Sequence, residues 1–284
     1  MKTSIDHLPE NKQSQLKSAV EIVRKYTDPE MIILFGSYAR GEWVDDLDEE
    51  TMNYRYQSDF DLLVITETAK QAEKVEENGH MNQSLRSRIR KTPISIIAES
   101  IESVNSNLRK QQYFFSDIKR EGILLFDSGR LKLDEPAEID DVLRKKLAQE
   151  DLDFWFNNAN EFLINFNAAL KRKSFNIAAF ELHQATENLL ATNLLVFTHY
   201  KPSTHDIEKL YSLVNSLHNE FITAFPLTTD KEQKLFKLLR RAYVNARYNK
   251  TYTINQEQLE WLAECVERLK ELTKKLCREK IERF

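Results

Sequence analysis

The N-terminal half of the chain alternates helical and strand-like patterns of apolar residues. Apolar side chains recur every three or four positions from Leu16 to Val23, a little after Pro9. This spacing predicts a helix with proline in its first turn. Residues 31–35 and 62–65 are short, wholly apolar runs. Such runs are typical of buried strands, so we expect a sheet that packs against helices.

The rest of this half continues the alternation. Residues 68–90 are polar and helical in composition, and residues 94–98 predict a third strand. Residues 122–126 and 130–133 flank an Asp-Ser-Gly turn, which predicts a β-hairpin. Residues 42–57 are rich in Asp, Glu and Tyr and lack periodicity. We interpret them as a surface excursion and assign them no conformation.

Strand signals disappear after residue 133. An acidic segment with one proline predicts a linker over residues 134–139. Five later stretches carry apolar residues at helical spacing and predict a helical bundle: 143–171, 175–196, 207–217, 232–248 and 256–281. Thr229 with Glu232, and Asn255 with Gln258, have the spacing of capping boxes. The fold class expected is therefore an α+β domain over residues 1–133 and an all-α domain over 140–284.

Composition narrows the possible classes of protein. A length of 284 residues suits two domains, and no window is apolar enough for a membrane span. The N-terminus lacks the apolar core of a secretory signal, and Cys265 and Cys277 are too far apart on one predicted helix to form a disulfide. We therefore expect a cytoplasmic protein. Its net charge of −4 argues against a broad nucleic-acid surface but permits a local basic cleft.

The candidate chemistry lies at two strand ends. Gly36 and Ser37 follow the first predicted strand, where a glycine lets backbone and hydroxyl approach a phosphate closely. Asp59 and Asp61 are two residues apart at the start of the next strand, so their side chains share a face and can bind one divalent cation. Arg40 is either a further phosphate ligand or a solvated loop residue.

A Gly-Ser turn followed by an Asp-x-Asp strand resembles the nucleotidyltransferase superfamily of the DNA polymerase beta type. The chain is more closely similar to minimal nucleotidyltransferases found beside or fused to HEPN domains. The resemblance implies Mg²⁺, an NTP substrate with ATP expected, and transfer of a nucleoside monophosphate to a hydroxyl group. The family also carries a third carboxylate, which activates that hydroxyl. Here Ser95 takes the inward-facing position of the third strand, and Glu99 is the candidate acid.

The helical half resembles a HEPN domain through residues 178–190 and the turn at 201–206. His183 and Glu187 are one turn apart, and we interpret them as a buried structural pair rather than a catalytic one. Ribonuclease members carry Arg and then His in the region that corresponds to residues 240–252, which contains no histidine here. We therefore do not expect RNA cleavage by the usual HEPN chemistry. Arg241, Arg247 and the nearby tyrosines either bind an anion or base, or simply pack.

The chain also resembles toxin–antitoxin pairs that consist of a nucleotidyltransferase and a HEPN protein. Their nucleotidyltransferase is an antitoxin that transfers AMP to a tyrosine beside the HEPN motif, and Tyr248 and Tyr252 occupy that region here. HEPN domains commonly pair, so the resemblance also implies a homodimer through the helical domain.

Two other functions remain open. The chain is alternatively a catalytically weak nucleotide-binding sensor or interaction protein, which Ser95 favours. A second alternative is an aminoglycoside nucleotidyltransferase, since those enzymes also join such a domain to a helical bundle.

Overall fold

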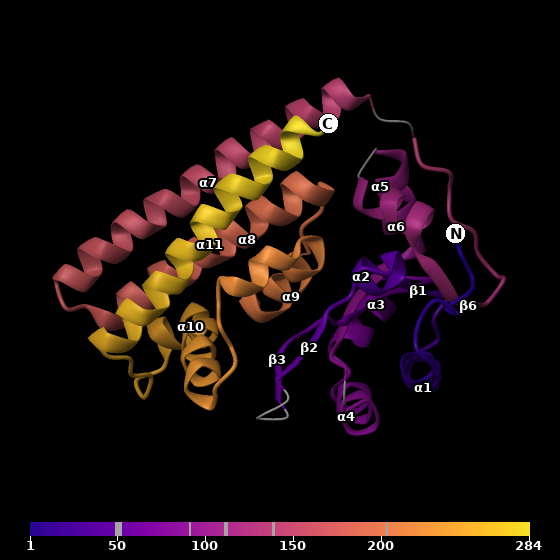
Figure 1. The fold of residues 1–284 in the computed structure, drawn as a ribbon, viewed down its shortest axis with the longest axis horizontal. Helices are drawn as coiled ribbons and strands as arrows, with labels where there is room; N and C mark the ends of the chain where they lie inside the picture. Colours follow the sequence, from indigo (N-terminus) through magenta and orange to yellow (C-terminus); the bar gives the residue numbers. More distant parts are fainter. Residues whose placement is uncertain (49–52, 91, 111–112, 138–139, 203) are drawn as a thin grey trace. The chain divides into compact units, whose positions relative to one another are not determined.

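The computed structural model describes residues 1–48, 53–90, 92–110, 113–137, 140–202 and 204–284 (Figure 1). The chain divides into two compact units, one of residues 1–47 with 56–139 and one of residues 140–284 with 48–55. Among the described helices, none has both the length and the apolar character that a membrane span requires.

The first unit is built around a four-stranded mixed sheet. Its strands are β1 (Met31–Phe35), β4 (Phe60–Thr66), β5 (Ile94–Ser100) and β6 (Ile123–Asp127), in the order β5-β4-β1-β6. β4 runs parallel to β5, whereas β1 is antiparallel to both β4 and β6. Its helices are α1 (Glu10–Tyr26), α2 (Gly36–Arg40), α3 (Ala69–Glu76), α4 (Gly79–Arg88), α5 (Ile101–Arg109) and α6 (Tyr113–Glu121).

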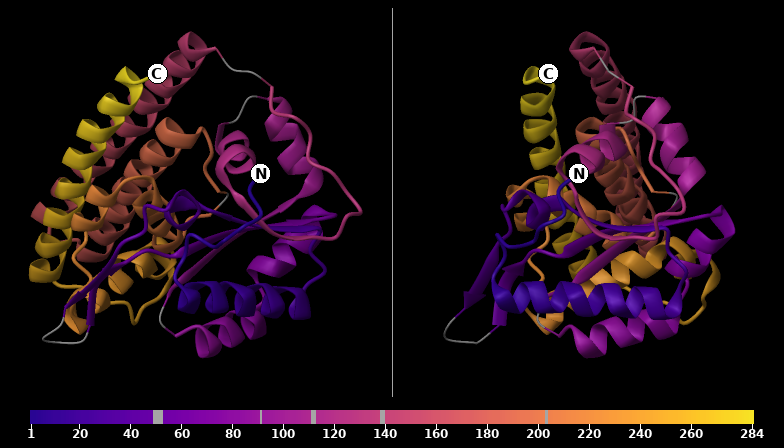
Figure 2. Two further views of the ribbon diagram at one scale, coloured as in Figure 1. Left: turned by 45° about the vertical axis from the view of Figure 1, so that its right-hand side comes forward. Right: turned by 90° about the vertical axis from the view of Figure 1, so that its right-hand side faces the viewer.

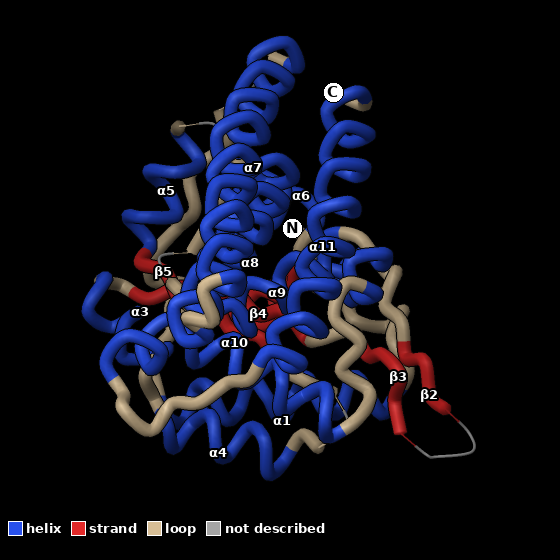
Figure 3. The backbone as a smooth tube through the Cα atoms, turned by 90° about the vertical axis from the view of Figure 1, so that its left-hand side faces the viewer, coloured by secondary structure: helices blue, strands red, loops and turns tan. Residues whose placement is uncertain are grey.

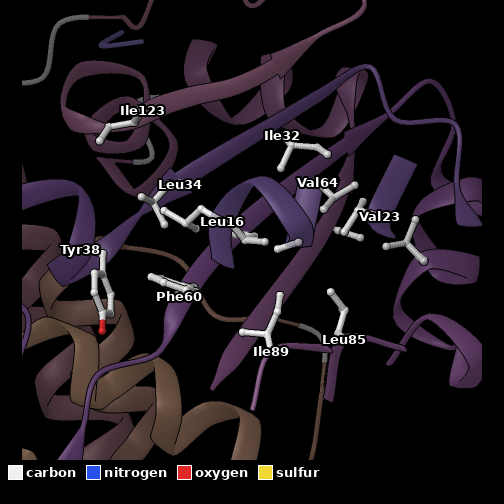
Figure 4. Packing of buried hydrophobic residues seen from close by; sticks show 14 of the residues in the cluster. Leu16, Val23, Ile32, Leu34, Tyr38, Phe60, Val64, Leu85, Ile89 and Ile123 are labelled. Carbon is white, nitrogen blue, oxygen red and sulfur yellow. The ribbon is translucent and has the colours of Figure 1, made fainter. Parts of the chain in front are cut away.

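Helices cover both faces of this sheet. α1 and α4 run side by side along one face (Figure 2), where Leu16 packs with Phe60 and Val64 of β4 in the main core (Figure 4). On the other face, the Phe35 ring meets Phe114 of α6 edge to face, with ring centroids 5.5 Å apart. Because successive side chains of a strand alternate in direction, the residues of β4 between those core positions point away from α1.

Three sequence interpretations of residues 42–133 change. The stretch 42–57 contains two strands, β2 (Asp45–Asp48) and β3 (Asn53–Gln57), which pair as a separate ribbon (Figure 3). The expected hairpin at 122–133 is wrong, because β6 pairs with β1 and residues 130–133 form no strand. The helical stretch 68–90 is divided into α3 and α4, and Asn78 caps the second of them.

The second unit is helical, as predicted. It contains α7 (Asp141–Lys171), α8 (Phe175–Thr198), α9 (Ile207–Leu217), the 3₁₀ helix η1 (Asn219–Thr223), α10 (Asp230–Tyr248) and α11 (Gln256–Glu282). The long helices α7, α8 and α11 pack alongside one another (Figure 1). Both predicted capping boxes are confirmed, at Thr229 for α10 and at Asn255 for α11. The α+β domain followed by an all-α domain is thus the fold class that the sequence predicted.

Candidate functional site

The site is centred on the bend between β1 and α2. Phe35, the last residue of β1, pairs with Asp61 of β4, so the chain turns at Gly36 directly beside that carboxylate. Gly36 adopts φ +73°, and a Cβ atom there would lie 2.3 Å from Oδ2 of Asp61. Glycine is therefore required both by the left-handed backbone and by the approach of the carboxylate.

Three side-chain oxygens at this bend are buried and have no hydrogen-bond partner among the residues that the structure describes. Asp61 is 1% exposed, and neither of its carboxylate oxygens has a hydrogen-bond partner. The Ser37 hydroxyl is also buried without a partner. Buried polar groups are nearly always hydrogen-bonded, so three unsatisfied oxygens at one bend indicate a place for a ligand. A hard divalent cation with phosphate oxygens fits this donor set.

Electrostatics support the same interpretation. Burial raises the pKa of Asp61 well above its ordinary value, the charge of Asp59 raises it further, and Arg40 lowers it. A neighbouring negative charge that raises the pKa of a carboxyl group is offset when a metal ion binds beside it. Arg40 itself forms an ion pair with Glu42, with Nε 2.8 Å from Oε2. The fold thus brings together all five residues that the sequence proposed for the nucleotide and the metal: Gly36, Ser37, Arg40, Asp59 and Asp61.

Glu99, the residue expected as a third acid, does not lie beside Asp61. Asp61 pairs with Ser95 across the parallel strands, whereas Glu99 pairs with Ile65. Four residues of strand separate Glu99 from the position beside Asp61, a distance of about 13 Å. Within the part of the chain that the structure describes, no three His, Cys, Asp or Glu side chains converge to hold a metal ion. A metal ion held by Asp59 and Asp61 would need further oxygen ligands, which the phosphates of a nucleotide can supply.

Lys12 of α1 lies close to this site, and sequence reasoning missed it. Its side chain is buried, and its ammonium contacts Tyr38, which immediately follows Ser37. A signal was available, because Lys12 precedes Leu16 by four residues and therefore lies on the apolar face of α1.

The helical unit contains a second polar cluster. Glu187 contacts His205, with Oε1 3.0 Å from Nδ1, and not its predicted partner His183. His183 instead stacks on Tyr243, which also stacks on His205. Burial, together with the nearby His205, lowers the pKa of His183 to about 4. His183 and Glu187 therefore do not pair with each other. Glu187 contacts His205, which lies in the turn at 201–206, and His183 is linked to His205 only through the ring of Tyr243.

The residues of the HEPN-motif region differ in accessibility. Arg241 is exposed, and the Arg247 guanidinium lies over the rings of Tyr243 and Tyr248. Tyr248 is 74% exposed. Tyr252 is buried, and its hydroxyl donates a 3.0 Å hydrogen bond to the Leu238 carbonyl. The Tyr252 hydroxyl is therefore not accessible as an acceptor of AMP, which corrects the expectation for this residue. Tyr248 remains a candidate acceptor, because its side chain is exposed.

Comparison with known families agrees with this architecture. The family of polymerase beta nucleotidyltransferases matches residues 17–131, and the HEPN domain family matches residues 152–276. No curated protein matches the chain significantly. A domain of the first type carries out nucleotidyl transfer with an NTP and a divalent metal ion. The chain therefore carries a polymerase beta-type nucleotidyltransferase domain followed by a HEPN domain.

Proposed function

We propose that the chain transfers AMP from ATP to a hydroxyl group on a protein or a small molecule, with Mg²⁺ as the metal ion. The observation that carries the proposal is the close approach of the Gly36 backbone to the Asp61 carboxylate. A carboxylate with two unsatisfied buried oxygens lies against a glycine that has no side chain to shield it, beside an equally unsatisfied Ser37 hydroxyl.

Each group has a role in this proposal. Asp59 and Asp61 would hold the metal ion, the Ser37 hydroxyl would donate a hydrogen bond to a phosphate oxygen, and Arg40 would add positive charge beside the phosphates. When bound, Mg²⁺ neutralises the charge of the triphosphate. The acceptor oxygen forms a bond to the α-phosphorus, and the bond from that phosphorus to the bridging oxygen of the β-phosphate breaks. Pyrophosphate leaves, and the acceptor proton passes to solvent.

The test uses the full chain and ATP labelled on its α-phosphate. We expect Mg²⁺-dependent release of pyrophosphate and transfer of the label. Asp61→Asn keeps the shape of the side chain but removes its charge, so transfer should fall at least about 100-fold. The matched control is Asp127→Asn, at the exposed end of β6, which should retain full activity. Pyrophosphate release that is equal in the wild type and in Asp61→Asn would refute the proposal.

A catalytically weak nucleotide-binding sensor is the second candidate. Ser95 favours it, because this residue lies beside Asp61 in the register where a third carboxylate would activate the acceptor. Calorimetry that shows Mg²⁺-dependent binding of ATP without pyrophosphate release would support the sensor. A panel of aminoglycosides, compared with the chain itself as acceptor, distinguishes antibiotic modification from protein modification.

A further inference from the structure

The ammonium group of Lys12 is buried within a set of three oxygen atoms. Lys12 is 4% exposed, yet its Nζ lies 2.8 Å from the Tyr38 hydroxyl, 2.9 Å from Oγ1 of Thr92 and 2.8 Å from Oδ2 of Asp45. An ammonium group has three N–H donors, so these three acceptors satisfy all of them. The Asp45 side chain is 27% exposed and supplies the only negative charge among them.

These partners belong to three segments that border the carboxylates. Tyr38 lies in α2, next to Ser37. Asp45 begins β2, at the root of the ribbon. Thr92 precedes Pro93, whose carbonyl accepts a 2.9 Å hydrogen bond from the backbone N–H of Phe60, the residue between the two aspartates. One ammonium group thus ties α2, the ribbon and the entry to β5 together.

Further contacts connect this cluster to Asp59. The Lys12 ammonium lies over the rings of Tyr38 and Phe60, 5.2 and 5.9 Å from their centroids. At the ribbon root, the Ser58 N–H donates a 2.9 Å hydrogen bond to the Val44 carbonyl, and Ser58 precedes Asp59. A displacement of Asp45 or Tyr38 would therefore be passed to the metal-binding carboxylates through directly bonded neighbours.

Stability alone does not account for a lysine here. Replacing a buried ion pair by apolar groups of similar volume is often neutral or stabilising, so such pairs are weak evidence of a structural role. Displacing reacting groups by about 1 Å, in contrast, can reduce a rate roughly 100-fold. We propose that Lys12 is a positioning residue of the nucleotidyltransferase site, whose ammonium fixes α2, the ribbon root and the entry to β5 around Asp59 and Asp61.

The inference rests on the proposed function. Its first test distinguishes an effect of Lys12 on the positions of the site residues from an effect on the stability of the fold. In Lys12→Met we expect kcat to fall about 100-fold with a much smaller change in the KM for ATP. The double variant Lys12→Met with Asp45→Asn leaves no unpaired charge, so its midpoint of urea unfolding should return close to that of the wild type. Its kcat should nevertheless remain low. Recovery of kcat together with stability would show a merely structural role and overturn the inference.

Lys17→Met is the matched control, because Lys17 is exposed on the same helix and should keep wild-type kcat. If Lys12→Met fails to fold, Thr92→Val and Tyr38→Phe each remove a single acceptor and should lower kcat roughly tenfold. Wild-type kcat in both of these variants would equally overturn the inference.

A second readout does not depend on turnover. Trp43 stacks on Tyr38 with ring centroids 5.5 Å apart, and the chain has only 3 tryptophans. In protein labelled with 5-fluorotryptophan, the fluorine resonance of Trp43, assigned with Trp43→Phe, should shift in Lys12→Met and in the double variant but not in Lys17→Met. An unchanged resonance would contradict the inference. If the wild type transfers no nucleotide, the proposed function fails, and a shifted resonance would then still show that Lys12 fixes the packing around Tyr38.

Discussion

Gly36 and Asp61 approach so closely that a Cβ atom on the glycine would lie 2.3 Å from a carboxylate oxygen. The contact joins the end of β1 to the start of β4, although the two residues are far apart in the sequence. It explains why this bend requires glycine, and it places the turn proposed to bind phosphate beside the side chain proposed to bind the metal ion.

Replacement of this glycine should therefore abolish transfer. In Gly36→Ala the new methyl group displaces the Asp61 carboxylate, and the left-handed φ of +73° adds about 1–2 kcal/mol of backbone strain. We expect transfer to fall at least about 100-fold. Gly129→Ala is the matched control, since Gly129 has the same φ and no atom within 4 Å of an added Cβ. It should lose similar stability and keep its activity; equal activity in both variants would show that the close approach does not matter.

Restoring a carboxylate beside Asp61 should accelerate transfer. Ser95 is the direct neighbour of Asp61 in the register, so Ser95→Asp places an acid where the acceptor hydroxyl needs a proton acceptor. A well-placed general base contributes about 100-fold or more, and we expect a gain of at least tenfold in kcat. Glu99→Gln, four residues along the same strand, should leave kcat unchanged. A loss of activity in Glu99→Gln would restore Glu99 as the third acid.

If the chain modifies itself, Tyr248 should be the acceptor. After incubation with ATP and Mg²⁺, intact-mass measurement should show an AMP-sized increment in the wild type and none in Tyr248→Phe, because the Tyr248 side chain is exposed. Tyr252→Phe should keep the increment and lose about 1 kcal/mol of stability with its hydrogen bond to Leu238. An increment that persists in Tyr248→Phe would exclude this acceptor.

The buried His183 should make stability depend on pH. Its pKa is about 4 in the folded chain and about 6.5 when unfolded, so the unfolded state binds more protons between these values. The contribution of neutral His183 is present above pH 6.5 and is lost as the pH falls toward 4, by at most about 3 kcal/mol. Urea unfolding at pH 7 and pH 5 measures this loss, which should shrink in His183→Gln. An equal loss in that variant would assign the effect to other groups.

Local patterns along the chain were sufficient for much of this architecture. Apolar residues at helical spacing predicted α1 and the α-helices α7 to α11 that the structure describes in the second unit, and wholly apolar runs predicted β1 and β4. These features depend on neighbours within one or two turns, so they can be recognised in sequence. The sequence likewise singled out candidates for phosphate and metal binding, namely Gly36, Ser37, Asp59 and Asp61. Their spacing relative to the predicted strands determines which side chains share a face.

Tertiary structure decided what depends on pairing between distant segments. Only the register of β4 and β5 shows that Ser95, and not Glu99, lies beside Asp61. The partner of β6 is β1 and not the segment that follows it, because sheet pairing is chosen by the whole core and not by the nearest turn. The burial of Lys12 among three oxygens likewise requires segments that are separated in sequence by up to 80 residues. The sequence alone determined the types of element and the chemistry available, whereas the fold determined which of those groups meet.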